Sequence, residues 1–288
     1  MRLRPLPSRT VTPGVLVLVA ALLVSLAAAP LAFADAFTPE SGGSPNADDI
    51  DTLYKIAFAV GMVIFLGVES TLLYALFRYR RRRGTPEPPQ IRGNFRLEIG
   101  WTVGAALILV VLAVITFVAL PAIRTPEASE QGGLARSVSG LMFAATDQPK
   151  APGAAPLNIK VNGQQFLWRY DYPQRGLYSY YEMVVPVNTT VTLDITASDV
   201  IHSWWIPRLG GKFDATPGYT NQTWFKISKP GVYEGQCAEL CGENHAQMLA
   251  RVRAVPVEEY REWTLNQAAG IAESQRQLAQ TRDQRENQ

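Results

Sequence analysis

The sequence predicts a two-helix transmembrane hairpin followed by an all-β Greek-key β-sandwich, with an N-terminal signal peptide before them. Two long apolar runs lie close to the N-terminus and are separated by a short arginine-rich loop. Short β-type runs then recur and are divided by turns that contain Pro and Gly. The net charge of the 288 residues is only +2, so we expect no nucleic-acid partner.

Residues 1–34 have the layout of a secretory signal peptide. Arginines come first, an apolar stretch follows, and a small-x-small cleavage site ends at Ala34. We expect cleavage after Ala34, and an uncleaved membrane anchor is the alternative. Residues 35–52 would then be an extracytoplasmic N-terminal segment.

The transmembrane hairpin is expected at 53–122, with spans at about 53–77 and 99–120. A bilayer core of ~30 Å needs about 20 helical residues, and each apolar run is long enough. Seven arginines lie in the loop between the spans, while the segment before the first span is acidic. The positive-inside rule therefore places the loop in the cytoplasm and the rest of the chain outside.

Two carboxylates belong to this hairpin. Glu69 lies inside the first span, where a carboxylate usually faces a protein partner or water. Glu98 opens the second span, and a negative charge at a helix N-terminus is favourable without any further role.

The rest of the chain divides into a linker, a β domain and a tail. Residues 123–156 are rich in Ala, Gly, Ser and Pro and predict a linker, with a short helix near 134–143. The domain at 157–257 is expected to be a Greek-key sandwich. Residues 258–288 predict a polar helix that gives way to a disordered tail. The β domain contains eight β-type runs, at 157–161, 166–172, 180–186, 190–197, 200–207, 222–228, 232–237 and 249–255.

The chain keeps its metal-binding side chains for one loop and one distant strand. The loop "GQCAELCGENHAQM" contains both cysteines of the protein, Cys237 and Cys241, together with His245 and Met248. The only other histidine, His202, lies in "VIHSWWIP".

Three interpretations of these residues remain open from spacing alone. A disulfide is natural in an exported domain but leaves the histidines and Met248 unexplained. A structural zinc site of the Cys2His2 type has no use for a thioether. Copper suits thiolate, imidazole and thioether together, and a second thiolate would allow two bridged copper ions suited to fast electron transfer.

The same loop resembles the C-x-E-x-C-x3-H-x2-M motif of subunit II of haem–copper cytochrome c oxidases. The stretch "SDVIHSWWIPRLGGKFDATPGYTNQ" (198–222) is similar to that family's other signature, and the out–in–out hairpin also matches. The resemblance implies a cupredoxin-like domain with a dinuclear copper centre, CuA. This centre would accept electrons from cytochrome c and pass them to haem in subunit I, where O2 is reduced to water with proton pumping. It also implies a multi-pass protein of the bacterial plasma membrane that assembles with other oxidase subunits.

The resemblance assigns roles residue by residue. Glu239 would bind copper through its backbone carbonyl and Mg²⁺ through its side chain, at the interface with subunit I. Asp214 matches an acidic residue near that interface, and Glu98 matches the glutamate at the entrance of a proton path. The implied copper ligands are His202, Cys237, Glu239, Cys241, His245 and Met248.

One segment departs from the family pattern. Electrons enter the family through an aromatic run, G-x-Q-W-x-W-x-Y, which here reads "GQQFLWRYDY". Phe166 takes the place of the first Trp, and Trp168 matches the second. Arg169 and Arg175 also reduce the negative charge expected to attract a basic cytochrome. We hypothesise a membrane-bound or differently charged cytochrome as the donor. The chain has no C-x-x-C-H motif, so any haem belongs to partner subunits.

Three other functions compete with this interpretation. A quinol-oxidase-type subunit II shares the fold but lacks the copper ligands. A nitrous oxide reductase-like protein shares the loop but needs a large His-rich domain. A copper-binding or copper-delivery cupredoxin would hold its metal in an exposed and exchangeable site.

Overall fold

The computed structural model describes residues 39–80, 87, 89–130, 132–134 and 156–286. The predicted signal peptide lies outside the described residues. So does almost all of the short helix expected near 134–143.

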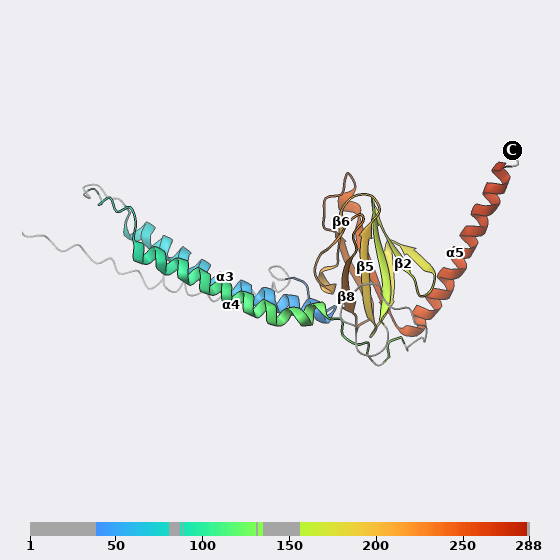
Figure 1. Cartoon of the computed structure of the whole chain (residues 1–288), viewed down its shortest axis with the longest axis horizontal. Helices are drawn as coiled ribbons and strands as arrows, with labels where there is room; N and C mark the ends of the chain where they lie inside the picture. The colour runs from blue at the N-terminus through green and yellow to red at the C-terminus, as the bar shows by residue number, and fades with distance from the viewer. Residues whose placement is uncertain (1–38, 81–86, 88, 131, 135–155, 287–288) are drawn as a thin grey trace, which may run out of the picture. The chain divides into compact units, whose positions relative to one another are not determined.

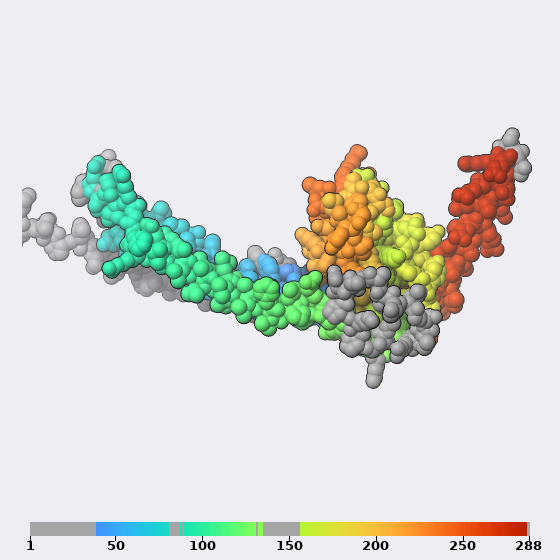
Figure 2. Space-filling model, viewed as in Figure 1, coloured from blue at the N-terminus to red at the C-terminus, as the bar shows by residue number. Residues whose placement is uncertain are grey.

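Two long helices, α3 (Pro45–Arg78) and α4 (Phe95–Arg124), form the hairpin. They lie side by side (Figures 1 and 2). Each begins before the predicted span because its first turn is polar, and hydropathy detects only the apolar part. Pro45 is favourable at the first helical position, and the Asn94 side chain accepts a hydrogen bond from the Leu97 N–H at the start of α4.

The hairpin presents an apolar surface. Both helices are long and apolar enough to cross a membrane, and α4 has no buried residue. Large side chains such as Phe65, Leu109 and Phe117 are more than half exposed. A surface of this kind is unfavourable in water and suits lipid.

The β domain consists of two five-stranded sheets. One has the order β3-β2-β1-β5-β8, and the other has the order β4-β10-β9-β6-β7. Within each sheet one pair is parallel, β1 with β5 and β10 with β4, as crossovers between the sheets require. The described residues form ten strands: β1 (Leu157–Gln164), β2 (Leu167–Tyr172), β3 (Leu177–Tyr180), β4 (Glu182–Pro186), β5 (Thr190–Ala197), β6 (His202–Trp205), β7 (Phe213–Ala215), β8 (Asn221–Lys226), β9 (Gly231–Cys237) and β10 (Leu249–Val255).

The core lies between the two sheets and is rich in aromatic residues. Alternate residues of β2, namely Trp168, Tyr170 and Tyr172, point to the same face and are fully buried. The Tyr172 hydroxyl donates to the Val184 carbonyl and accepts from the Val184 N–H, which joins the two sheets.

The C-terminal helix α5 (Val257–Glu286) is longer than the sequence predicts. The tail that was expected to be disordered is helical as far as Glu286. Its first turns are fixed by aromatic packing. Tyr260 is fully buried, and Trp263 stacks on it and also contacts Tyr172, with ring centroids 5.8 and 5.2 Å apart. This packing provides a nucleus from which a polar helix can extend.

Part of the predicted linker packs on the β domain. The ammonium of Lys226, on β8, is paired with Glu127 at 2.7 Å and with Glu130 at 2.8 Å. The Thr190 hydroxyl donates to the Glu127 carbonyl. These contacts hold the beginning of the linker against the sheet.

The segment at the start of α3 contacts the outer edge of β8. The Asn46 side chain donates to the Trp224 carbonyl, and the Lys226 N–H donates to the Ser44 hydroxyl. The Trp224 indole donates to the carbonyl of Ile123, near the end of α4. Both outer ends of the hairpin are therefore hydrogen-bonded to this edge strand.

Candidate metal centre

Strand pairing brings distant His202 to the cysteine loop. His202 is the first residue of β6, and Cys237 is the last residue of β9. These strands are antiparallel neighbours with Trp204 opposite Cys237, and the Ala238 N–H donates to the Ser203 carbonyl. The register therefore fixes His202 beside the loop, although 35 residues separate it from Cys237.

The loop between β9 and β10 folds back on its own base. The Cys237 N–H donates to the Met248 carbonyl at 2.9 Å, which closes the loop. A short 3-10 helix, η2 (His245–Gln247), places His245 next to Cys241. Gly242 has a φ of +138° and lies against Phe166, where a Cβ would be 3.0 Å from the phenyl ring. A side chain at position 242 would push the loop away from that ring.

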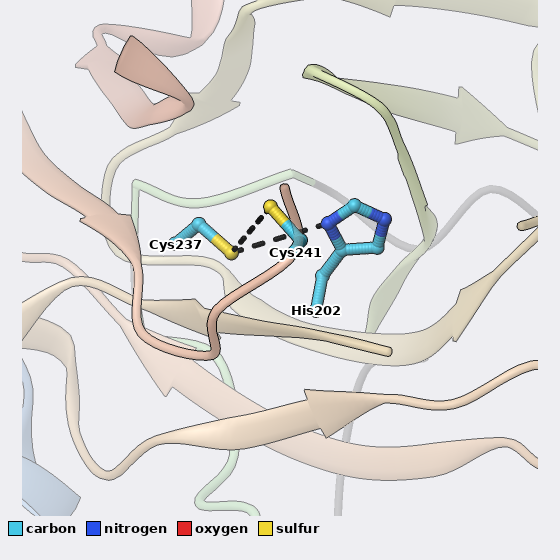
Figure 3. Close-up of side chains that lie close together, drawn as sticks. All are labelled: His202, Cys237 and Cys241. Atoms are coloured by element: carbon cyan, nitrogen blue, oxygen red, sulfur yellow. Dashed lines mark hydrogen bonds between the residues drawn. The ribbon is translucent and has the colours of Figure 1, made fainter. Parts of the chain in front are cut away.

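Two thiols and one imidazole form the centre of the site (Figure 3). The Sγ atoms of Cys237 and Cys241 are 3.9 Å apart, and Cys237 Sγ is 4.0 Å from His202 Nδ1. The ligand atoms of these three buried residues all lie within 4.8 Å of one another. His245 joins this group through Cys241, with 3.6 Å between its Nδ1 and the sulfur.

Two weaker donors complete the set that the sequence predicts. Met248 is buried, and its Sδ is 3.9 Å from Cys241 Sγ. The backbone carbonyl of Glu239 accepts from the Cys237 thiol at 3.3 Å. All six predicted donors are therefore brought together by the fold.

The two cysteines are free thiols rather than a disulfide, because their sulfurs are well beyond the S–S bond length of about 2.05 Å. Burial, together with the neighbouring Cys237, raises the pKa of Cys241 to about 11. A metal ion must displace the thiol protons when it binds. The dry surroundings favour this exchange because a cation would neutralise the thiolates.

Asp199 and Gln165 are two polar contacts of the site that the sequence analysis did not identify. Asp199 Oδ1 is 2.8 Å from His202 Nε2, and Gln165 Nε2 donates to the Cys241 carbonyl. Burial alone would raise the pKa of Asp199, but hydrogen bonds from His202, Gln165 and Val200 outweigh it and lower the pKa. The available signal in the sequence was a carboxylate three residues before a candidate ligand.

The two aromatic residues predicted for electron transfer from the donor lie in different environments. Trp168 is fully buried, and its ring is close to that of His202. Phe166 is partly buried and packs against the core and Gly242. Arg169 forms an ion pair with Asp171 and lies over the Tyr178 ring, so its charge is largely neutralised locally.

The remaining predicted residues lie outside this cluster. The Asp214 side chain is exposed on β7, and its carbonyl accepts from the Asn221 side chain. The Glu239 side chain is exposed. Glu98 accepts from the Asn94 N–H at 3.0 Å and completes a reciprocal cap with the Asn94 side chain. The cap lies at the helix N-terminus, where a negative charge was expected to be favourable without any further role.

The fold and site define a membrane-anchored β-sandwich protein with a buried cluster of thiols and imidazole that could hold a metal ion. Two family models match the chain. The model for the cytochrome c oxidase subunit II transmembrane domain matches residues 32–119, and the model for its periplasmic domain matches residues 174–255. The chain belongs to the cytochrome c oxidase subunit II family. The second match includes all six candidate ligands but begins after Phe166 and Trp168.

Two relatives named cytochrome c oxidase subunit 2 agree with this assignment. The chain is 36% identical over 223 residues to "Cytochrome c oxidase subunit 2" of Alkalihalophilus pseudofirmus, covering 75% of this chain and 59% of that protein. It is 34% identical over 253 residues to the protein of the same name from Synechocystis, covering 80% and 76%. A solved structure, the periplasmic domain of subunit II of cytochrome oxidase of Bradyrhizobium japonicum, is 38% identical and covers 42% of this chain and 97% of its own, with a TM-score of 0.40.

Proposed function

We propose that this chain is the electron-accepting subunit II of an aerobic respiratory cytochrome c oxidase in a bacterial plasma membrane. Its β domain would accept electrons from cytochrome c and pass them to haem in subunit I, where O2 is reduced with proton pumping. The observation that carries the proposal is the convergence of two thiols, two imidazoles, a thioether and a backbone carbonyl.

The donor set fits a dinuclear copper centre better than zinc. Zinc takes thiolate, imidazole and carboxylate ligands and would leave the thioether unused, whereas a buried thioether beside two thiolates and two imidazoles suits copper. When bound, such a centre supplies one-electron redox chemistry with the charge shared over two ions. The residues of the chain exclude water, because His202, Cys237, Cys241 and Met248 are each at most 5% exposed. Buried ligands of this kind change little in solvation when the charge of the site changes, although His245 is only half-buried.

Further roles follow from family membership. We propose that the exposed Glu239 carboxylate binds Mg²⁺ at an interface with subunit I, with Asp214 nearby, since a hard oxygen ligand suits Mg²⁺. We propose Glu98 as the entrance of a proton path in addition to its cap. Electrons from the donor would enter near Phe166, with Trp168 behind it.

A metal-loading experiment tests the copper assignment. The full chain is purified in detergent and loaded with copper, because the outer ends of the hairpin are bonded to β8. We expect two coppers per chain and a seven-line hyperfine pattern in the EPR spectrum, as two equivalent copper nuclei give. A four-line pattern or an EPR-silent oxidised state would contradict the dinuclear centre. One loosely held copper would favour copper delivery.

A further inference from the structure

We propose that Asp199 and Gln165 are positioning residues of the metal centre. Asp199 fixes the ring of His202, and Gln165 connects that carboxylate to the cysteine loop. The inference rests on the proposed function, because it takes His202 and Cys241 as metal ligands. Neither Asp199 nor Gln165 supplies a donor atom to the set itself.

The orientation of the His202 ring carries the first step. Its Nδ1 faces Cys237 Sγ, and its Nε2 is 2.8 Å from Asp199 Oδ1. A neutral imidazole has one N–H and one lone pair, and a carboxylate accepts only. Nε2 therefore carries the proton, and the lone pair of Nδ1 points toward the sulfurs. A ligand histidine commonly donates its outer N–H to a carboxylate, which fixes the tautomer and the ring orientation.

Asp199 is itself held in place by two backbone groups. Its Oδ2 accepts from the Gln165 N–H at 2.7 Å, and its Oδ1 accepts from the Val200 N–H at 2.7 Å. The Gln165 side chain then donates to the Cys241 carbonyl at 2.6 Å. A continuous chain of hydrogen bonds thus runs from the His202 ring to the cysteine loop. It passes through the turn between β1 and β2.

The second imidazole has no such support within the described residues. His245 is half-buried, its Nδ1 faces Cys241, and its Nε2 forms no hydrogen bond in the part of the chain that the structure describes. His202, in contrast, is fully buried. The two imidazoles are therefore held unequally, and the loss of Asp199 is expected to disturb His202 selectively.

A variant series on the full chain in detergent tests this role. Copper retention against a chelator and the EPR spectrum are compared for wild type, Asp199→Asn, Asp199→Ala and Gln165→Ala. We expect Asp199→Ala to retain copper about 10–100-fold less tightly and to show an altered hyperfine pattern. Asp199→Asn keeps an oxygen that accepts from His202 Nε2, so it should retain most of the affinity. Gln165→Ala should fall between the two.

Glu243→Gln is the matched control, because Glu243 is an exposed carboxylate in the same loop. It removes one negative charge and should leave copper retention and the spectrum unchanged. Circular dichroism of the copper-free variants checks that each has folded. If Asp199→Ala does not fold, Asp199→Asn and Gln165→Ala still allow the comparison.

Two results would overturn the inference. One is an Asp199→Ala variant whose EPR spectrum and copper retention equal those of the wild type. If the only change in that variant were slower reduction by cytochrome c, Asp199 would be assigned to donor docking instead. The other is an equal loss in Asp199→Asn and Asp199→Ala, since only the first keeps the bond to His202. A four-line spectrum from the wild-type chain would count against the proposed function only, because copper retention is compared whatever the number of ions bound.

Discussion

The indole ring of Trp168 lies nearly edge-on to the imidazole of His202, with 5.9 Å between the ring centroids and 65° between the planes. Trp168 is fully buried, so it makes no surface contact with an electron donor. Its ring packs against the candidate ligand His202 from the side of the core. If an electron donor docks near this strand, we expect the contact to involve Phe166, which precedes β2 and is partly exposed.

Replacement of Trp168 should destabilise the β domain and the site together. We expect Trp168→Ala to cost about 3–5 kcal/mol of unfolding free energy, because it leaves a large cavity next to His202. Trp168→Phe should cost much less, since it keeps a ring and removes an indole N–H that has no hydrogen-bond partner among the described residues. Thermal unfolding and copper content of both variants are the measurements. Equal stability of the two would contradict the packing role.

Replacement of Phe166 should affect electron transfer and leave the metal in place. We expect Phe166→Ala to slow reduction by cytochrome c in stopped-flow measurements while copper content stays at the wild-type level. The Phe166 ring covers Gly242 at the surface of the loop but contributes no donor atom. An unchanged reduction rate would exclude this position from the electron path.

A steep salt dependence with a soluble basic cytochrome would contradict a membrane-bound or differently charged donor.

A single methyl group at Gly163 should disturb His202. A Cβ there would lie 2.8 Å from His202 Cδ2 and 3.1 Å from Trp168 Cζ3. We expect Gly163→Ala to cost about 1–3 kcal/mol through overpacking and to change the EPR spectrum. Gly270→Ala, on α5 with open space around the position, is the control and should stabilise the helix by up to about 1 kcal/mol.

The Lys226 ion pairs should behave cooperatively. Lys226 is buried, while Glu127 and Glu130 are about half exposed. We expect either single Glu→Gln change to cost under about 1 kcal/mol, because the other glutamate still compensates the ammonium. The double variant should cost about 3 kcal/mol, since it leaves a buried charge alone. Additive losses in chemical denaturation would contradict a shared ion pair.

The same lysine gives a pH dependence. Burial lowers the pKa of Lys226, but hydrogen bonds to Glu127 and Glu130 more than offset it and raise the pKa above 10.5. A raised pKa stabilises the fold below the unfolded value, and this stabilisation is lost as the pH rises through the folded value. We therefore expect the stability difference between wild type and Lys226→Met to shrink above pH 10.5.

Removal of the Tyr260 hydroxyl should stabilise the protein. This hydroxyl is buried and has no hydrogen-bond partner among the described residues, so Tyr260→Phe should raise stability by about 1 kcal/mol. Tyr172→Phe is the matched control and should destabilise, because it leaves both backbone groups of Val184 unpaired. Thermal unfolding distinguishes the two, and a loss of stability in Tyr260→Phe would contradict the expectation.

Tyr260 also predicts behaviour at high pH. Burial raises its pKa to about 12, against an ordinary value of 10.0. The neutral phenol is favoured in the fold, so this stabilisation is present below pH 10.0 and is lost as the pH rises through about 12. Tyrosinate absorbance should therefore show a late-titrating group in the wild type that is absent from Tyr260→Phe.

The sequence predicts those features that depend on local pattern or on rare residues. A helix that lies in lipid needs a contiguous apolar run, and this run is visible in the sequence for both helices. Their polar ends lie outside the run and were therefore not predicted. The candidate ligands stand out in the sequence because the chain has only two cysteines and two histidines. Strands β3 and β7 were missed because they have four and three residues and depend on pairing with neighbours.

Other features depend on three-dimensional neighbours that no local pattern reveals. Asp199 and Gln165 are common polar residues, and only strand pairing places them beside His202 and Cys241. Trp168 and Phe166 look equivalent in an aromatic run, but Phe166 lies in the turn before β2 begins at Leu167, whereas Trp168 lies in the strand and points into the core. The start of α5 is fixed by the packing of Trp263 against Tyr172, a contact between distant parts of the chain.

The bonds from Ser44 and Asn46 to β8 have a consequence for aggregation. β8 is the last strand of its sheet, and an uncovered edge offers free N–H and carbonyl groups to another chain. Ser44 occupies the Lys226 N–H, and Asn46 occupies the Trp224 carbonyl. A soluble fragment that begins after α4 would lack both Ser44 and Asn46. Its β8 edge would then be open to strand pairing with another chain. The start of the membrane anchor thus also closes this part of the sheet edge to strand pairing with another chain.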